Sequence, residues 1–211
     1  MEEIYEQSPQ TEANAYLLDS VQSNVYKYDV DEDFEEPKRL RDLTRLLDTQ
    51  TENDTTILRI NHFGGSLFVL LAVVNSIQGS KGRVIAEVIH GSSAGSLLAL
   101  ACDDCFTVKF GEWFIHEQQS ANYGDLSYRA SQIDFSIKTQ RHLFDELYSG
   151  FLTEAEIEDL CSGKIREYNF DYLEANERLV KWREYKESLV EDIDIDLVKE
   201  DKEIENKEGD K

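Results

Sequence analysis

Basic residues are scarce in this chain. It has 22 lysines and arginines against 44 aspartates and glutamates, which gives a formal net charge of −22. Because such a surface repels phosphate, we expect neither a nucleic-acid partner nor docking on an anionic membrane. The charge bears on partners and solubility and says little about the fold.

Long apolar runs are missing as well. The most apolar stretch, residues 67–74, is far shorter than the roughly 18 residues that a membrane helix needs. Half of residues 1–6 are glutamates, and this segment contains no apolar core of a secretory signal. We therefore expect no membrane association and a cytoplasmic protein.

Cysteines are few. Cys102 and Cys105 have the CxxC spacing that zinc sites and redox motifs use, but a four-ligand zinc site wants a second pair and Cys161 stands alone. We expect two ordinary thiols near the start of a strand in a reducing compartment, with no metal and no cofactor.

At 211 residues the chain is long enough for one domain with a sizeable core. Residues 1–22 are polar and acidic, and we expect a flexible arm there. The folded domain is expected over residues 23–185. Residues 186–211 form an acidic tail with little apolar periodicity, which we expect to be disordered because it cannot bury enough surface.

Strand and helix patterns alternate along the domain. Strands are predicted at residues 24–30, 56–60, 83–89, 106–109 and 112–115. Helices are predicted at residues 37–50, 67–78, 97–102, 126–148 and 171–180, with a short one opened by a capping box at Thr153 and Glu156. This alternation predicts an α/β domain with a largely parallel sheet and right-handed crossovers.

Two strands run into turns of small residues that open helices, residues 61–66 and 90–96. A serine at such a turn lies where backbone N–H groups point outward, which suits acyl transfer. Ser93 fits this place, because Ala94 and Gly95 follow it and a helix begins at once. His116, after the strand at residues 112–115, is a candidate base. Each turn alone is more often ordinary close packing.

Taken in series, these segments resemble the Clp protease proteolytic subunit family, which has the crotonase-like fold. Residues 61–66 (Asn-His-Phe-Gly-Gly-Ser) resemble its Asn-Ser-Pro-Gly-Gly turn. Residues 93–98 resemble its nucleophile segment, and residues 113–118 resemble its strand ending in Ile-His-Gln. Helix 126–148 is similar to the projecting handle helix through which the family's rings meet. The resemblance implies stacked βαβ units over most of the domain.

The resemblance also implies a site. Ser93 would be the nucleophile, His116 its general base, and the N–H groups of Gly65 and Ala94 the oxyanion hole. The family's third member lies eight residues before the alanine of a Glu-Ala pair, which selects Glu167 ahead of Glu174 and Ala175, with Asp171 as the alternative.

The chain departs from the family's pattern at several positions. Phe63 stands where proline is usual, and Ile89 stands where a glycine precedes the nucleophile. A shifted frame would place Gly95 at the nucleophile, implying a catalytically silent subunit. Ser92 and Ser96 are neighbouring serines to which the nucleophile could be misassigned. We prefer Ser93 because the following glycine and leucines then also fit.

The resemblance implies a serine endopeptidase that cleaves unfolded polypeptide through a Ser-His-acid acyl transfer. It also implies heptameric rings, stacked as tetradecamers around a chamber, and an ATP-dependent unfoldase as partner. The main alternative is a catalytically silent ring subunit or scaffold. An acyl-CoA enzyme of the crotonase fold would need no serine–histidine pair, and a signal peptide peptidase would want a serine–lysine dyad.

Overall fold

A computed structural model describes residues 23–31, 37–119 and 123–189 of the protein. Its centre is one five-stranded sheet in which the strands lie side by side in chain order. The first four are parallel, and the fifth runs antiparallel to the fourth. The strands are β1 (Val25–Val30), β2 (Thr55–His62), β3 (Arg83–Ser92), β4 (Asp104–His116) and β5 (Glu167–Asp171). The expected α/β class with a largely parallel sheet is confirmed.

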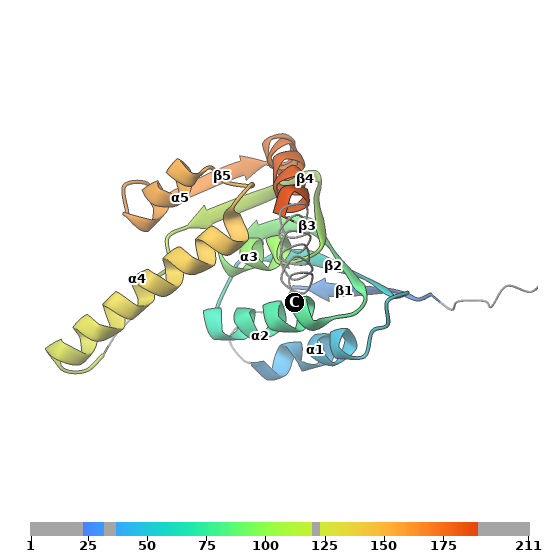
Figure 1. The fold of residues 1–211 in the computed structure, drawn as a ribbon, viewed down its shortest axis with the longest axis horizontal. Helices are drawn as coiled ribbons and strands as arrows, with labels where there is room; N and C mark the ends of the chain where they lie inside the picture. Colours follow the sequence, from blue (N-terminus) through green and yellow to red (C-terminus); the bar gives the residue numbers. More distant parts are fainter. Residues whose placement is uncertain (1–22, 32–36, 120–122, 190–211) are drawn as a thin grey trace, which may run out of the picture.

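Helices fill the connections between the strands (Figure 1). They are the 3-10 turn η1 (Pro37–Leu40) and the helices α1 (Arg41–Asp48), α2 (Leu67–Gly79), α3 (Ala94–Leu100), α4 (Leu126–Tyr148) and α5 (Glu154–Cys161). Residues 172–189 form a further helix, longer than the predicted one, and the domain boundary expected at residue 185 falls inside it. The capping box of Thr153 and Glu156 opens α5 as predicted.

The two faces of the sheet differ in composition. Alternate residues of β2 and β3 are fully buried against the helices, among them Leu58, Ile60 and Val88. The opposite face carries ion pairs that run across three strands, with Arg59 between Asp29 and Glu87. Period-two alternation thus puts the core on one face and leaves the other polar.

The fourth strand corrects the sequence interpretation. We expected two strands at residues 106–109 and 112–115, and β4 is one strand through both. Its register against β3 shifts between Val88 and His90, and Phe110 takes a φ of 69°. At Gly111 a β-carbon would lie 2.8 Å from the carbonyl oxygen of Val88. Residues 110–111, which we expected to form a turn between two strands, therefore form a bulge within β4.

The fifth strand was not predicted. Residues 167–171 pair with β4 over its last five residues. Tyr168 and Phe170 alternate with polar residues there, and Phe170 is buried. This strand places Glu167 directly opposite His116.

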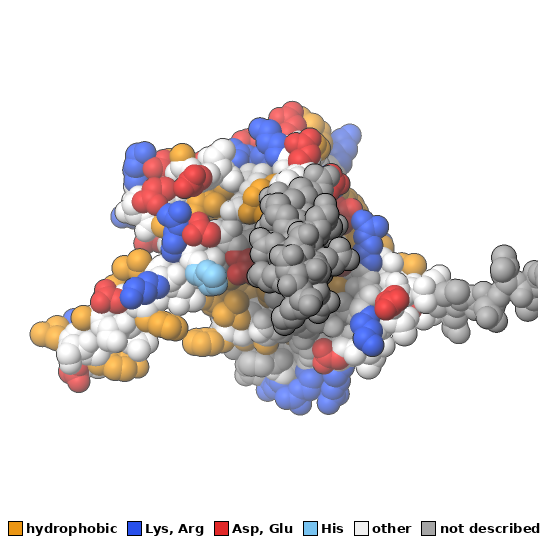
Figure 2. Space-filling view, viewed as in Figure 1, with side chains coloured by type: hydrophobic (Ala, Val, Ile, Leu, Met, Phe, Trp, Pro, Cys, Tyr) orange, Lys and Arg blue, Asp and Glu red, His pale blue; other side chains and the backbone are white. Residues whose placement is uncertain are grey.

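Helix α4 extends from the body of the protein (Figure 1). Its carboxyl-terminal part is anchored by buried Phe144, Leu147 and Tyr148. In its projecting part Ile133 and Ile137 are 48% and 56% exposed, and Figure 2 shows hydrophobic side chains along the projection. Leu143 and Leu147 therefore pack on the core, while Ile133 and Ile137 face outward.

None of the helices in the described ranges is both long enough and apolar enough to cross a membrane. The acidic arm expected at residues 1–22 lies outside the described residues, as do residues 190–211 of the expected tail.

Candidate functional site

Ser93 occupies a strained position between β3 and α3. Its φ and ψ are 53° and −121°, and it is one of two non-glycine residues with positive φ in the described part of the chain. Its N–H donates to the carbonyl of Phe114 on the neighbouring strand at 2.8 Å. Such conformations cost free energy and are found where a side chain must be presented in an unusual direction. Gly95, the position that the shifted frame would assign to the nucleophile, lies inside α3.

The turn after β2 packs directly against Ser93. A β-carbon on Gly64 would lie 2.6 Å from Cβ and 3.0 Å from Oγ of Ser93, so only glycine fits there. Gly64 and Gly65 both have positive φ, 109° and 146°. Ala94 is the first residue of α3, so its N–H has no acceptor within the helix. The two predicted oxyanion donors thus belong to the two turns that meet at Ser93.

The neighbouring serines have other roles. Ser96 is fully buried, and its Oγ donates to the carbonyl of Ser93 at 2.7 Å. The same oxygen is 2.7 Å from the hydroxyl of Tyr148 on α4, to which it is hydrogen-bonded. Ser96 therefore supports the turn from beneath, and Ser92 is a buried residue at the end of β3.

His116 ends β4 and lies two residues beyond Phe114. Its Nδ1 is 2.6 Å from the carbonyl oxygen of Glu117. A carbonyl can only accept, so Nδ1 carries the proton and the neutral ring keeps its lone pair on Nε2. That tautomer is the one a general base needs. The N–H of Glu117 donates to the carbonyl of Arg166 at 3.1 Å, which fixes this peptide to the β5 segment.

Ser93 and His116 come from adjacent strand ends, but the structure joins their side chains by no hydrogen bond, although both lie in described ranges. Phe114 lies between them in the ladder, and its ring centroid is 5.5 Å from that of His116. Two residues along a strand span about 6.6 Å. The two side chains are therefore not hydrogen-bonded to each other in this conformation.

The two candidate acids lie at opposite ends of β5. Glu167 is exposed and directly across from His116 on the same face, at a separation typical of cross-strand pairs. Asp171 is four residues away, and its carboxylate accepts from the N–H groups of Leu173 and Glu174 at 2.8 and 3.0 Å. Asp171 therefore caps the helix at residues 172–189, and Glu167 is the cross-strand neighbour of His116.

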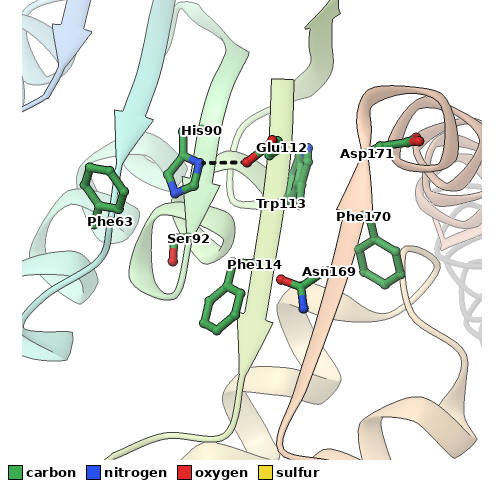
Figure 3. A pocket seen from close by; sticks show the side chains of 9 residues that line it. All are labelled: Phe63, His90, Ser92, Glu112, Trp113, Phe114, Asn169, Phe170 and Asp171. Atoms are coloured by element: carbon green, nitrogen blue, oxygen red, sulfur yellow. Dashed lines mark ion pairs between the residues drawn. The ribbon is translucent and has the colours of Figure 1, made fainter. Parts of the chain in front are cut away.

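A cavity of about 540 Å³ opens beside this site on the polar face of the sheet. Figure 3 shows Phe63 beside His90 and the ion pair of His90 with Glu112. The cavity is lined by Phe63, His90, Ser92, Glu112, Trp113, Phe114, Asn169, Phe170 and Asp171. Its lining includes Ser92 and Phe114, the chain neighbour and the backbone partner of Ser93, but not Ser93, His116 or Glu167.

No protein-family model matches the sequence. No curated protein matches it significantly. Any assignment of function therefore depends on the site itself.

Sequence reasoning missed the cavity and the carbonyl of Glu117 that contacts His116. It also missed His62, whose Nδ1 accepts a hydrogen bond from the N–H of Gly64. The spacing of His90 and Ser92 on one strand and Glu112 and Phe114 on the next has the period of two that places all four on one face. That signal was available. A backbone carbonyl carries no sequence signal, so the Glu117 carbonyl that orients His116 could not be predicted from the sequence.

The cysteines do not contribute to the site. Cys102 and Cys105 are fully buried, and burial raises the pKa of both thiols well above the usual range. Within residues 23–31, 37–119 and 123–189 no three histidine, cysteine or acidic side chains are grouped to hold a metal ion. The thiols are structural parts of the core.

Proposed function

We propose that this protein is a serine peptidase subunit similar to the Clp protease proteolytic subunits, with stacked βαβ units of the crotonase-like type. The observation that carries the proposal is the backbone of Ser93, a strained serine between a parallel strand and a helix. A glycine turn contacts its side chain, and a histidine in the base tautomer ends the next strand.

The chemistry would be acyl transfer to serine. Nε2 of His116 takes the hydroxyl proton of Ser93 as Oγ forms a bond to a peptide carbonyl carbon. The N–H groups of Gly65 and Ala94 stabilise the oxyanion. His116 then protonates the leaving amine, and water releases the acyl group by the same steps. Glu167, the cross-strand neighbour of His116, would stabilise the imidazolium that forms between these steps.

Labelling with a fluorophosphonate probe tests the nucleophile. We expect the probe to modify Ser93, with the site located by peptide mass spectrometry. Ser93→Ala should remove labelling and lower peptidase activity by several orders of magnitude. Ser92→Ala, which changes the adjacent residue only, is the matched control. Labelling at any other serine, or none at all, would contradict the proposal.

The lack of a hydrogen bond between the described side chains of Ser93 and His116 favours a second candidate, a catalytically silent subunit or scaffold. In that case the strained turn would be kept for assembly or binding, and the probe would leave the protein unmodified at all concentrations. Wild-type labelling that depends on His116 excludes this candidate, because a silent serine needs no base.

Assembly is part of the proposal and is supported by α4. Its projecting part carries exposed apolar side chains: Leu126, Tyr128, Ile133, Phe135 and Ile137. Patches of this kind mark sites of association. Pairing of this helix with a second copy would join rings, and unfolded polypeptide delivered by an ATP-dependent unfoldase would be the substrate.

Sedimentation tests the role of α4. We expect particles several times larger than the 24.3 kDa chain at micromolar concentration. The double variant Ile133→Asp, Ile137→Asp should release smaller species, since charges would then lie in the contact. Glu146→Gln, at an exposed position near the anchored end, is the control. A wild-type monomer at this concentration would overturn ring assembly.

A further inference from the structure

We propose that His62 is a positioning residue that holds the Gly64–Gly65 turn against Ser93. The inference rests on the proposed function and goes beyond it, since His62 would act through backbone contacts. His62 is the last residue of β2 and is only 2% exposed.

The ring of His62 binds the turn that follows it. Its Nδ1 accepts a hydrogen bond from the N–H of Gly64 at 2.8 Å. A backbone N–H can only donate, so Nδ1 carries no proton and the neutral ring has its proton on Nε2. This is the opposite tautomer to that of His116. The two histidines, at the ends of β2 and β4, thus hydrogen-bond to the backbone through Nδ1 in opposite senses.

The bond matters because Gly64 is in contact with Ser93. Gly64 has a φ of 109°, and the position of its missing β-carbon is 3.0 Å from Oγ of Ser93. A glycine in this region of backbone space has many other conformations open to it. The hydrogen bond from Gly64 to His62 selects one of them, so it fixes the wall against which the serine side chain rests.

His62 also touches the second turn. At Gly95 a β-carbon would lie 3.1 Å from the carbonyl oxygen and 3.3 Å from Cβ of His62. The backbone of His62 thus packs closely against the first turn of α3, two residues after Ser93. His62 therefore contacts both the Gly64–Gly65 turn and the start of α3, the helix that follows Ser93.

Loss of the acceptor should affect chemistry more than binding. A freed glycine turn would leave the fold and the cavity in place but misplace the Gly65 N–H and the wall beside Oγ. Displacements of this size change the rate of a positioned reaction steeply. We expect kcat to fall with little change in KM.

Two variants at position 62 separate the hydrogen bond from packing. In His62→Asn the Oδ1 atom is as many bonds from Cβ as Nδ1 is in histidine, so it can accept from Gly64. His62→Leu fills the site without an acceptor. We expect the fluorophosphonate modification rate to fall at least about tenfold in His62→Leu and to stay within about threefold of wild type in His62→Asn.

A stability control completes the test. Leu43→Ala removes core packing on α1, away from the site, and should lower the melting temperature without changing the modification rate of the folded protein. Equal rate losses in His62→Asn and His62→Leu would overturn the proposal, as would a His62→Leu protein as reactive as wild type.

Nitrogen-15 NMR of the histidines gives a readout that needs no activity. We expect His62 to show the Nε2–H tautomer, and a proton on Nδ1 would overturn the inference. If the wild-type serine is unreactive, the proposed function fails while the tautomer still reports on the hydrogen bond. The two failures are therefore distinguishable.

Discussion

The two edges of the parallel sheet contrast in how their polar groups are satisfied. At the amino edge, where β1 and β2 begin, both carboxylate oxygens of Asp54 are used. Asn24 donates to one of them through its backbone and side-chain nitrogens, at 3.1 and 2.8 Å. Thr51 donates to the other through its N–H and hydroxyl, both at 2.8 Å. Nearby, Gln50 bonds to Thr56 and accepts from Ser80.

The carboxyl edge is different. Ser93, Gly64 and Gly65 have positive φ there, and a cavity opens beside them. Ligands of parallel α/β sheets bind at the carboxyl ends of the strands. Backbone strain and the cavity of about 540 Å³ coincide at the carboxyl edge, while side-chain hydrogen bonds surround Asp54 at the amino edge. Substitutions at the carboxyl edge should therefore affect the reactivity of Ser93, and substitutions at the amino edge should affect the free energy of unfolding.

The largest effect is expected from Gly64→Ala at the carboxyl edge. The new methyl group would lie 2.6 Å from Cβ of Ser93, on a backbone that disfavours any side chain. We expect the fluorophosphonate labelling rate to fall by about 100-fold. Gly79→Ala is the control, because its β-carbon meets nothing within 4 Å and its backbone is ordinary. If both variants were labelled at the wild-type rate, the glycine turn would not belong to the site.

A smaller effect is expected from the acids of β5. The Glu117 carbonyl already fixes the tautomer of His116, so Glu167→Gln should lower turnover only about tenfold, or about 1.4 kcal/mol. Asp171→Ala should instead lower the free energy of unfolding by about 1 kcal/mol through loss of a helix cap, with turnover unchanged. Steady-state kinetics and urea unfolding of both variants measure this. A steep loss of turnover in Asp171→Ala would reverse the assignment.

The smallest effect concerns stability at the amino edge. Hydrogen bonds from Thr51, first from its backbone N–H and then from its hydroxyl, lower the pKa of Asp54 to about 2, with Asn24 contributing further. Because the folded pKa lies below the unfolded value, this stabilisation is complete above about pH 4 and is lost as the pH falls toward 2. Asp54→Asn should show a flatter loss of unfolding free energy over this range in urea titrations, with unchanged labelling of Ser93. Parallel acid profiles for the two proteins would contradict the lowered pKa.

Much of the fold follows from local patterns. Apolar alternation predicted β1, β2 and β3, and α4 was predicted with its observed bounds. The strand at residues 167–171 was missed because it is short and gains its stability from pairing with β4, which lies 51 residues away in the ladder between His116 and Glu167. The break expected in β4 was wrong because Gly111 permits a bulge, which looks like a turn in the sequence.

The site was partly predictable for the same reason. A serine followed by small residues at a strand-to-helix turn identifies Ser93, and the structure gives it the strained backbone. What orients its neighbours is backbone chemistry: the carbonyl of Glu117 for His116, and the N–H of Gly64 for His62. Every residue has these groups, so only the folded chain shows which of them meet a side chain.

The order of the strands bears on how the molecule forms. Since each strand lies beside its predecessor in the chain, every new strand can pair with an edge that already exists as synthesis proceeds. The turn at Ser93 cannot form as early as the strand pairs before it, because the N–H of Ser93 donates to the carbonyl of Phe114 on the next strand. His116 in turn gains its cross-strand neighbour only when Glu167 arrives. We expect most of the core of a nascent chain to form before the turn at Ser93 reaches its final geometry. The unfolded segments of the chain itself would then be synthesised before the site is complete.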